Sequence, residues 1–184
     1  MDPFLIIDKY YAPGSRLSAI LKDHGVKVAE KSLEIAGNLP ASWQVDLDFI
    51  EKAAILHDIG IFKTRSESIG CNGDLPYICH GFLGRQILDQ EGLDPAYGLV
   101  AERHTGAGIT LSNIIRNDLP LPQRDMVPVS LAEKIICCAD KYFSKSPPKN
   151  NLPMTAGKIT EKLEKISPDH ARRFAGWAEE FQLG

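Results

Sequence analysis

The chain has no apolar run long enough to span a lipid bilayer, so the sequence predicts no transmembrane helix and no membrane partner. No basic residue precedes the short apolar stretch at 4–7, and Asp2 and Asp8 flank it, which is unlike a secretory signal peptide. The chain also has no excess of positive charge. Its net charge of −3 argues against a general nucleic-acid-binding surface, although a local basic patch is compatible with it.

The cysteines show no metal-binding or redox spacing. The chain has four of them and no CxxC motif; they are Cys71, Cys79, Cys137 and Cys138. The last two lie in the apolar run 135–139, which favours buried free thiols. Because nothing indicates export or disulfide bonding, we expect a cytoplasmic location.

Strand patterns, internal repeats and low-complexity tracts are also missing, whereas helical signals dominate. Apolar residues recur at spacings of three and four in the segments 15–37, 47–60, 80–92, 94–104, 130–140 and 167–181. Gly- and Pro-containing loops are expected at 61–79, 105–128 and 144–154. With 184 residues the chain can bury one substantial core. We therefore expect an all-α fold, formed as one irregular helical bundle.

Six polar residues fall on the apolar faces of these helices: His24, His57, Asp58, His80, His104 and Asp140. A single buried histidine is usually just hydrogen-bonded in the core. A buried carboxylate, however, is costly unless something neutralises its charge. Four imidazoles and two carboxylates on successive helices favour a metal site, with ligands that suit Zn, Fe, Mn or Co. The fifth histidine, His170, lies among charged residues, and we expect it at the surface.

The string His57-Asp58-Ile59-Gly60 resembles the HDIG motif of the HD superfamily of metal-dependent phosphohydrolases. The order of the flanking residues is more specific than the His-Asp pair, because His24 precedes it and His80, His104 and Asp140 follow. The resemblance implies an HD-domain-like helical bundle. It predicts one domain over 1–184, with a motif-bearing core at 17–146 and C-terminal helices at 155–183 packed on it.

The resemblance also implies a ligand set for two divalent ions. The first ion would be held by His24, His57, Asp58 and Asp140. Asp58 would bridge to a second ion, which His80 and His104 would also bind. Such dinuclear members include HD-GYP cyclic dinucleotide phosphodiesterases and the bacterial enzymes that cleave dinucleoside tetraphosphates symmetrically.

The residues around the ligand positions resemble those of the dinucleoside tetraphosphatases more than those of the HD-GYP proteins. His80-Gly81 and the run Glu133-Lys134-Ile135-Ile136 before Ala139-Asp140 match that pattern. The GYP element is absent, and Ile61 stands where HD-GYP proteins usually carry lysine after HDIG.

The implied chemistry is hydrolysis of a small-molecule phosphate ester or anhydride, with a nucleotide as the expected substrate. Two ions, chosen among Fe, Mn, Co, Ni and Zn, lower the pKa of a bridging water, and the hydroxide attacks phosphorus in line. His57 and Asp58 would be central to this chemistry. Four basic residues close in sequence to the motif or the ligands are candidates for phosphate binding: Lys63, Arg65, Arg103 and Lys141. Such residues near helix ends are also often simply solvated.

Three other interpretations stay open. A mononuclear HD nucleotidase would use His80 and His104 only to orient substrate, and metal content would separate it from a dinuclear enzyme. Some HD-fold proteins with these six ligands are di-iron oxygenases, which bound iron and oxygen consumption would reveal. The third is a non-enzymatic metal- or nucleotide-binding regulatory domain. Neither the substrate, the leaving-group acid nor the oligomeric state follows from the residues.

Overall fold

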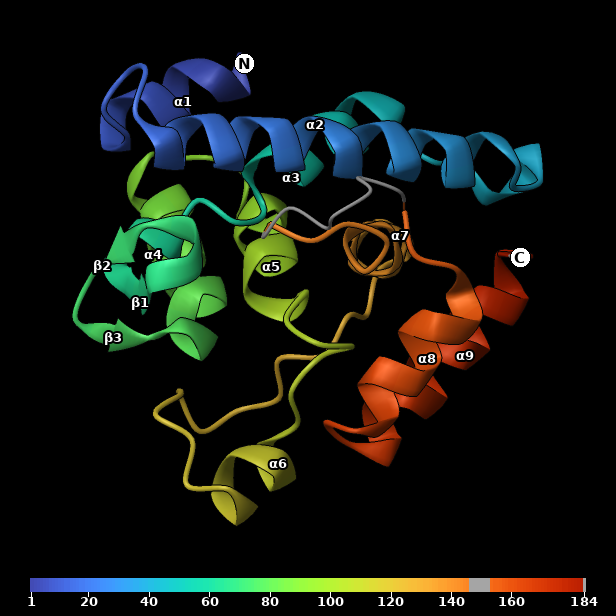
Figure 1. Cartoon of the computed structure of the whole chain (residues 1–184). Helices are drawn as coiled ribbons and strands as arrows, with labels where there is room; N and C mark the ends of the chain where they lie inside the picture. Colours follow the sequence, from blue (N-terminus) through green and yellow to red (C-terminus); the bar gives the residue numbers. More distant parts are fainter. Residues whose placement is uncertain (146–152, 184) are drawn as a thin grey trace.

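The computed structural model describes residues 1–145 and 153–183, and it confirms the all-α prediction (Figure 1). Its helices are α1 Pro3–Tyr10, α2 Arg16–Gly37, α3 Leu47–Leu56, α4 His80–Gln90, α5 Pro95–Arg103, α6 Leu111–Arg116, α7 Leu131–Asp140, α8 Ala156–Glu164 and α9 Pro168–Glu180. Of the loop predicted at 144–154, residues 146–152 lie outside the described part. Within the described ranges, no helix combines the length and the apolar character that crossing a membrane requires.

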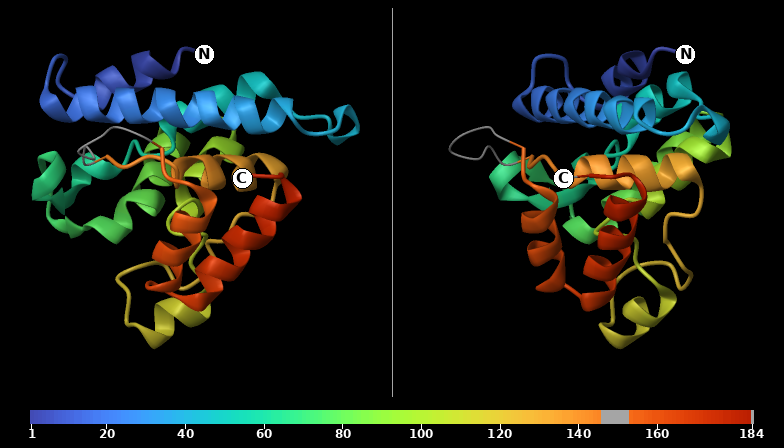
Figure 2. Two further views of the ribbon diagram at one scale, coloured as in Figure 1. Left: turned by 45° about the vertical axis from the view of Figure 1, so that its right-hand side comes forward. Right: turned by 90° about the vertical axis from the view of Figure 1, so that its right-hand side faces the viewer.

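Helix α2 lies along one side of the molecule, with α1 above it and helices α4 to α9 below it in the views of Figures 1 and 2. It packs against both α3 and α7, while α4 pairs with α5. Helices α8 and α9 form a hairpin that contacts α7 through α9. Because α3 and α7 both contact α2 and α5, residues at their ends can meet in the middle of the bundle.

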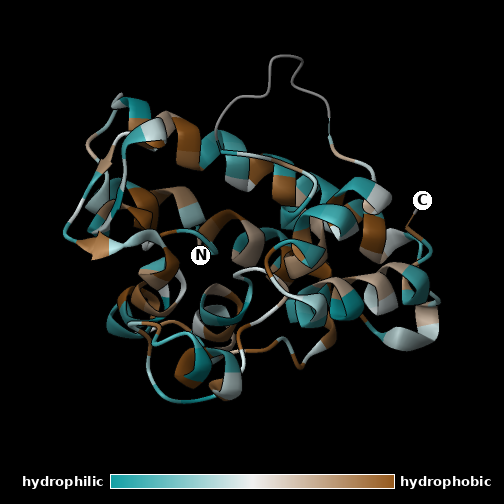
Figure 3. Ribbon diagram, turned by 60° about the horizontal axis from the view of Figure 1, so that its bottom comes forward, coloured by the Kyte–Doolittle hydropathy of each residue, from teal (hydrophilic) through white to brown (hydrophobic). Residues whose placement is uncertain are grey.

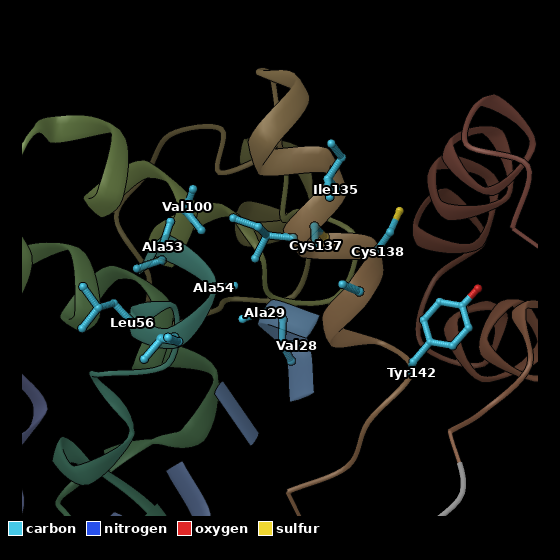
Figure 4. Packing of buried hydrophobic residues seen from close by; sticks show 14 of the residues in the cluster. Val28, Ala29, Ala53, Ala54, Leu56, Val100, Ile135, Cys137, Cys138 and Tyr142 are labelled. Atoms are coloured by element: carbon cyan, nitrogen blue, oxygen red, sulfur yellow. The ribbon is translucent and has the colours of Figure 1, made fainter. Parts of the chain in front are cut away.

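The main core forms where α2, α3, α5 and α7 face one another (Figure 4). Val28, Ala54, Val100 and Ile135 come one from each of these helices, and each is at most 1% exposed. Small residues such as Ala54 let the helix backbones approach closely. The helices carry both hydrophobic and hydrophilic residues, as the mixed colouring of the same helices in Figure 3 shows.

Capping side chains fix the helix starts that the sequence predicts. Ser15, Asp94 and Ser167 each accept a hydrogen bond from a backbone N–H of the first turn. At α7, Ser130 Oγ accepts a hydrogen bond from the Glu133 N–H. The Glu133 carboxylate in turn accepts a hydrogen bond from the Val129 N–H and not from the Ser130 N–H. Ser130 and Glu133, a pair with capping-box spacing, therefore form only half of a capping box.

Two helices and a small sheet were not predicted. Helix α1 and the short α6, inside the predicted loop 105–128, add to the helical content. Strands β1 Thr64–Ser66, β2 Cys71–Asn72 and β3 Leu75–Pro76 form a sheet in the order β2-β1-β3. The β1–β2 pair is antiparallel and the β1–β3 pair is parallel. Strands of two or three residues are too short to show an alternating pattern in the sequence.

Candidate metal centre

The six polar residues predicted on apolar faces come together in one buried cluster, called here the His–Asp cluster: His24, His57, Asp58, His80, His104 and Asp140. Each is at most 6% exposed. Their ligand atoms form two groups in which all atoms lie within 4.8 Å of one another. The first group is His24, His57, Asp58 and Asp140, and the second is Asp58, His80 and His104. Only Asp58 belongs to both.

Helix ends supply most of the cluster. His57 and His104 are the C-terminal caps of α3 and α5, His80 begins α4, and Asp140 ends α7. His24 alone lies inside a helix, on the buried face of α2. Ligands at helix ends are held by the packing of whole helices, so the fold itself fixes their separation.

Two glycines allow this packing. At Gly25, next to His24, a Cβ would lie 2.9 Å from the carbonyl oxygen of Ile55, so only glycine lets α2 approach the end of α3 this closely. At Gly60, the last residue of the HDIG motif, a Cβ would lie 2.2 Å from the carbonyl oxygen of His80. The motif glycine therefore makes room for the backbone of a residue of the cluster.

Backbone hydrogen bonds orient three of the four imidazoles. In each, Nδ1 lies within hydrogen-bond distance of the carbonyl oxygen three residues earlier: His57 to Ala54 at 2.6 Å, His80 to Tyr77 at 2.6 Å and His104 to Ala101 at 2.8 Å. A carbonyl only accepts, so Nδ1 carries a proton, and in the neutral ring Nε2 then presents a lone pair. This is the arrangement that metal-binding histidines adopt.

In the first group, the Nε2 atoms of His24 and His57 converge on the two carboxylates. His24 Nε2 lies 2.9 Å from Asp140 Oδ1 and 3.4 Å from Asp58 Oδ2. His57 Nε2 lies 3.2 Å from Asp58 Oδ2 and 3.4 Å from Asp140 Oδ1. Four ligand atoms thus surround one point, which is the coordination number of many divalent metal sites.

The second group uses the other oxygen of Asp58. His80 Nε2 and His104 Nε2 lie 3.4 and 3.3 Å from Asp58 Oδ1. The two Nε2 atoms are 3.0 Å apart. Because both Nδ1 atoms carry protons, two lone pairs face each other across this gap, which is unfavourable unless a cation lies beside both. A metal ion that both nitrogens coordinate meets that requirement.

The charge states of the cluster also suit a cation. Burial lowers the pKa of His24 to about 4 and that of His80 to about 3, so both imidazoles are neutral near pH 7, as metal coordination requires. Burial opposes ionisation of Asp58 and Asp140, yet neighbouring cationic groups hold the pKa of each carboxyl well below its usual value. At His57 burial lowers the pKa, but Asp58 and Asp140 outweigh burial and raise it to about 9, so without a metal ion this ring itself carries the positive charge that the carboxylates attract, and a bound cation would displace its Nε2 proton.

Unsatisfied atoms point to the same conclusion. Among the described residues, His57 Nε2 and both Asp58 oxygens are buried without a hydrogen-bond partner of acceptable geometry. The ammonium of Lys145 offsets part of the Asp58 charge at Oδ2, but within the described part of the chain Oδ1 has neither a hydrogen bond nor a lysine or arginine partner, so a cation beside it would be favourable. The imidazoles and carboxylates of the His–Asp cluster, the orientation of their nitrogens and the buried atoms without hydrogen-bond partners therefore all fit divalent metal ions.

Two lysines border the cluster. Lys141, predicted from the sequence, ion-pairs with Asp140 and donates a hydrogen bond to the His104 carbonyl at 3.0 Å. Lys145 was not predicted, although its Nζ lies 2.6 Å from Asp58 Oδ2. Asp58 and Asp140 raise the pKa of Lys145 against the effect of burial. It follows α7 in a segment without periodicity, so no pattern in the sequence marks it.

The other predicted basic residues make different contacts. Arg103 pairs with Glu133 at 2.9 Å and thereby links α5 to α7. The ammonium of Lys63 lies 5.9 Å from the centre of the Phe62 ring, and Arg65 is exposed on β1. None of the contacts described for these three basic residues reaches the His–Asp cluster.

The prediction that His170 lies at the surface is wrong. Its side chain is buried, at 6% exposure, although its neighbour Arg172 is exposed. The ring packs against the backbone of Gly106, where a Cβ would lie 2.4 Å from Nδ1. The tertiary packing of α9 against this loop, and not its local sequence, determines the burial.

The model of the HD domain family matches residues 21–144, so the chain belongs to the HD domain family. Among curated relatives, an uncharacterized protein of Methanocaldococcus jannaschii is 38% identical over 122 residues, covering 66% of this chain and 64% of that protein. A tRNA (cytidine(56)-2'-O)-methyltransferase of Thermoplasma volcanium is 32% identical over 138 residues, covering 75% of this chain and 35% of that protein. The chain thus spans only part of the length of these relatives.

Solved structures share the fold. The HD domain of the L. monocytogenes phosphodiesterase PgpH superposes with a TM-score of 0.53 at 16% identity, covering 97% of this chain and 87% of that one. The same domain in complex with cyclic-di-AMP gives a TM-score of 0.55 at 15% identity, covering 98% and 87%. At these identities the likeness shows a common fold. Helices α8 and α9 lie outside the family match, whereas the superpositions cover 97% and 98% of this chain.

Proposed function

We propose that the chain hydrolyses a nucleotide phosphate ester or anhydride at the His–Asp cluster, with two divalent metal ions bound. The observation that carries this proposal is that the two carboxylate oxygens of Asp58 face different pairs of histidines. Its Oδ2 faces His24 and His57 while its Oδ1 faces His80 and His104. A carboxylate that presents one oxygen to each of two ligand groups is suited to bridge two ions.

The ions, when bound, supply the activation of a water molecule and the neutralisation of phosphate charge. The chain's own residues position them: Nδ1–H bonds to the backbone hold three imidazoles in the required tautomer. In the reaction a water oxygen forms a bond to phosphorus and the bond to the leaving oxygen breaks. The water gives up a proton, and the leaving oxygen takes one up.

Lysines supply positive charge beside the cluster. A cavity of about 440 Å³, called here the lysine cavity, is lined by Asp140, Lys141, Lys145 and Lys162 among others. An ammonium group binds phosphate as a compact point charge. We propose that Lys145 contacts a phosphate oxygen of the substrate, since its Nζ already lies beside the cluster.

A nucleotide is the substrate class that we favour. The PgpH domain that shares this fold is a phosphodiesterase solved with cyclic-di-AMP, a nucleotide ligand. The lysine cavity complements the phosphate of such a compound. Dinucleoside polyphosphates belong among the candidates because the motif resembles that of the symmetrical tetraphosphatases.

The test is a hydrolysis screen of the metal-reconstituted chain against nucleotides, dinucleoside polyphosphates and simple phosphate esters, with metal analysis of the same samples. We expect hydrolysis of at least one nucleotide compound and about two ions per chain. Asp58→Asn should remove most bound metal and the activity. The matched control is Asp48→Asn, which makes the same change on the exposed face of α3, where the side chain is 71% exposed.

Other results discriminate the alternatives. One ion per chain with full activity would favour a mononuclear nucleotidase, and bound iron with oxygen consumption would favour an oxygenase. Metal binding without turnover of any compound would favour a regulatory domain. Full activity of Asp58→Asn after removal of all metal would refute the proposal.

A further inference from the structure

A second cavity, of about 600 Å³, lies beside the His–Asp cluster between α6 and the start of α9; it is called here the α6–α9 cavity. His80 lines it, and Thr105 Oγ1, also in its wall, lies 3.5 Å from His80 Nε2. The α6–α9 cavity and the lysine cavity share Tyr77, Gly106 and Ile166 as lining residues. A ligand at the cluster can therefore extend into both.

The two cavities differ in chemistry. The α6–α9 cavity has apolar walls that include Ile109, Leu119 and Ile166, and Arg116 is the one charged side chain among its lining residues other than histidine. Three lysines line the other cavity. Ligand sites of a few hundred Å³ typically combine apolar walls with a few placed polar groups. The phosphate of a substrate therefore suits the lysine cavity, and an uncharged part of it suits the α6–α9 cavity.

His170 is the polar group that distinguishes the α6–α9 cavity. Its Nδ1 is buried without a hydrogen-bond partner, and no described hydrogen bond involves its Nε2. Gly106, at φ +62°, leaves the space that the imidazole ring occupies. Burial lowers the pKa of His170 to about 4, so the ring is neutral and offers one donor and one acceptor. Because Nδ1 lies against Gly106, Nε2 is the ring nitrogen that can hydrogen-bond a ligand group in the cavity.

We propose that the α6–α9 cavity binds an uncharged heteroaromatic group of the substrate, a nucleobase, and that His170 is a specificity-determining residue that hydrogen-bonds its edge. The inference rests on the proposed function, since the cluster and the lysine cavity would hold the phosphate. A nucleobase presents alternating donors and acceptors in one plane, which an apolar cavity with one imidazole can recognise. Residue 170 lies outside the HD family match, so this specificity would belong to the C-terminal helices.

The experiment measures binding to the metal-reconstituted full chain by calorimetry. The ligands are the four nucleoside 5′-phosphonates in which carbon replaces the bridging oxygen, so that they resist hydrolysis, and the ribose 5-phosphonate that lacks a base. At least one nucleoside compound should bind about tenfold or more tightly than the base-free compound. In His170→Leu that advantage should fall about three- to tenfold, the value of one hydrogen bond, while the base-free compound binds as before.

Two further variants keep the test decisive if His170→Leu unfolds. His170→Gln retains a donor and an acceptor and should preserve part of the preference. Leu119→Trp narrows the α6–α9 cavity and should reduce binding of the nucleoside compounds only. Equal affinity of all five compounds for the wild type, each lost on chelation, would overturn this inference and leave the proposed function intact. Absence of any metal-dependent binding would overturn the proposed function, and this inference with it.

Discussion

Replacing Gly60 with alanine tests whether the HDIG glycine is required by space alone. Gly60 has φ −81°, a conformation that alanine adopts without strain. The obstacle is contact: a Cβ would lie 2.2 Å from the His80 carbonyl oxygen and 2.5 Å from the Gly84 nitrogen. Since ordinary contacts begin near 3.4 Å, the start of α4 must move by about 1 Å. Overpacking of this kind costs about 1–3 kcal/mol, or more when backbone must shift.

The consequence for the site is larger than the cost in stability. Metal ligands must be held within about 0.5 Å of their working positions, so a 1 Å shift of His80 should remove the second ion. We expect Gly60→Ala to lower Tm by about 6–12 °C for a 3 kcal/mol loss and to halve the metal content. Calorimetry and elemental analysis measure these quantities.

The control is Gly176→Ala in α9, where a Cβ meets nothing within 4 Å. There the substitution should stabilise the helix by about 0.5–1 kcal/mol. A Gly60→Ala protein with the wild-type Tm and the wild-type metal content would show that the close approach of Gly60 to the start of α4 is not required, and would refute this prediction.

Three other predictions concern the surroundings of the cluster. Tyr11→Phe removes a buried hydroxyl that donates to the Ile59 carbonyl at 2.7 Å, and it should cost about 1–3 kcal/mol in urea unfolding; an unchanged midpoint would contradict this. Glu102→Ala leaves Arg85 and Arg124 without the buried carboxylate that both contact, and it should cost about 1.5–3 kcal/mol because water can solvate both guanidinium groups; a loss below about 0.5 kcal/mol would show that these ion pairs do not stabilise the fold. Chelation of ions present at 100 times their Kd should lower the unfolding free energy by about 2.7 kcal/mol per site, and a Tm that chelator leaves unchanged would count against a bound metal.

Helices with several turns and a capping residue were predictable, because periodicity and cap reinforce each other. Helix α2 begins after Ser15 and ends at Gly37, as expected. Helix α1 was missed, although Asp2 and Pro3 begin it in the same way that Asp94 and Pro95 begin α5, because its eight residues show little periodicity. Helix α6 has only six residues, and its Thr110 capping box with Asn113 uses a less common partner.

Within the site, helical periodicity marked the six residues of the His–Asp cluster, since each had to point into the core. It could not mark Lys145, which follows α7 outside any regular element. His170 was predicted wrongly for a related reason. Charged neighbours suggested a solvent-exposed face, whereas the packing of α9 against Gly106 turned this one side chain inward. Contacts between segments distant in sequence leave no local signal.

Anomalous diffraction from crystals of the chain grown with Mn²⁺ would test the central claim most directly. The account predicts two peaks in the His–Asp cluster, one on each side of the Asp58 carboxylate. One should lie within reach of His24, His57 and Asp140, and the other within reach of His80 and His104. A single peak at the first group would contradict the dinuclear assignment. Peaks elsewhere, with none at the cluster, would contradict the account as a whole.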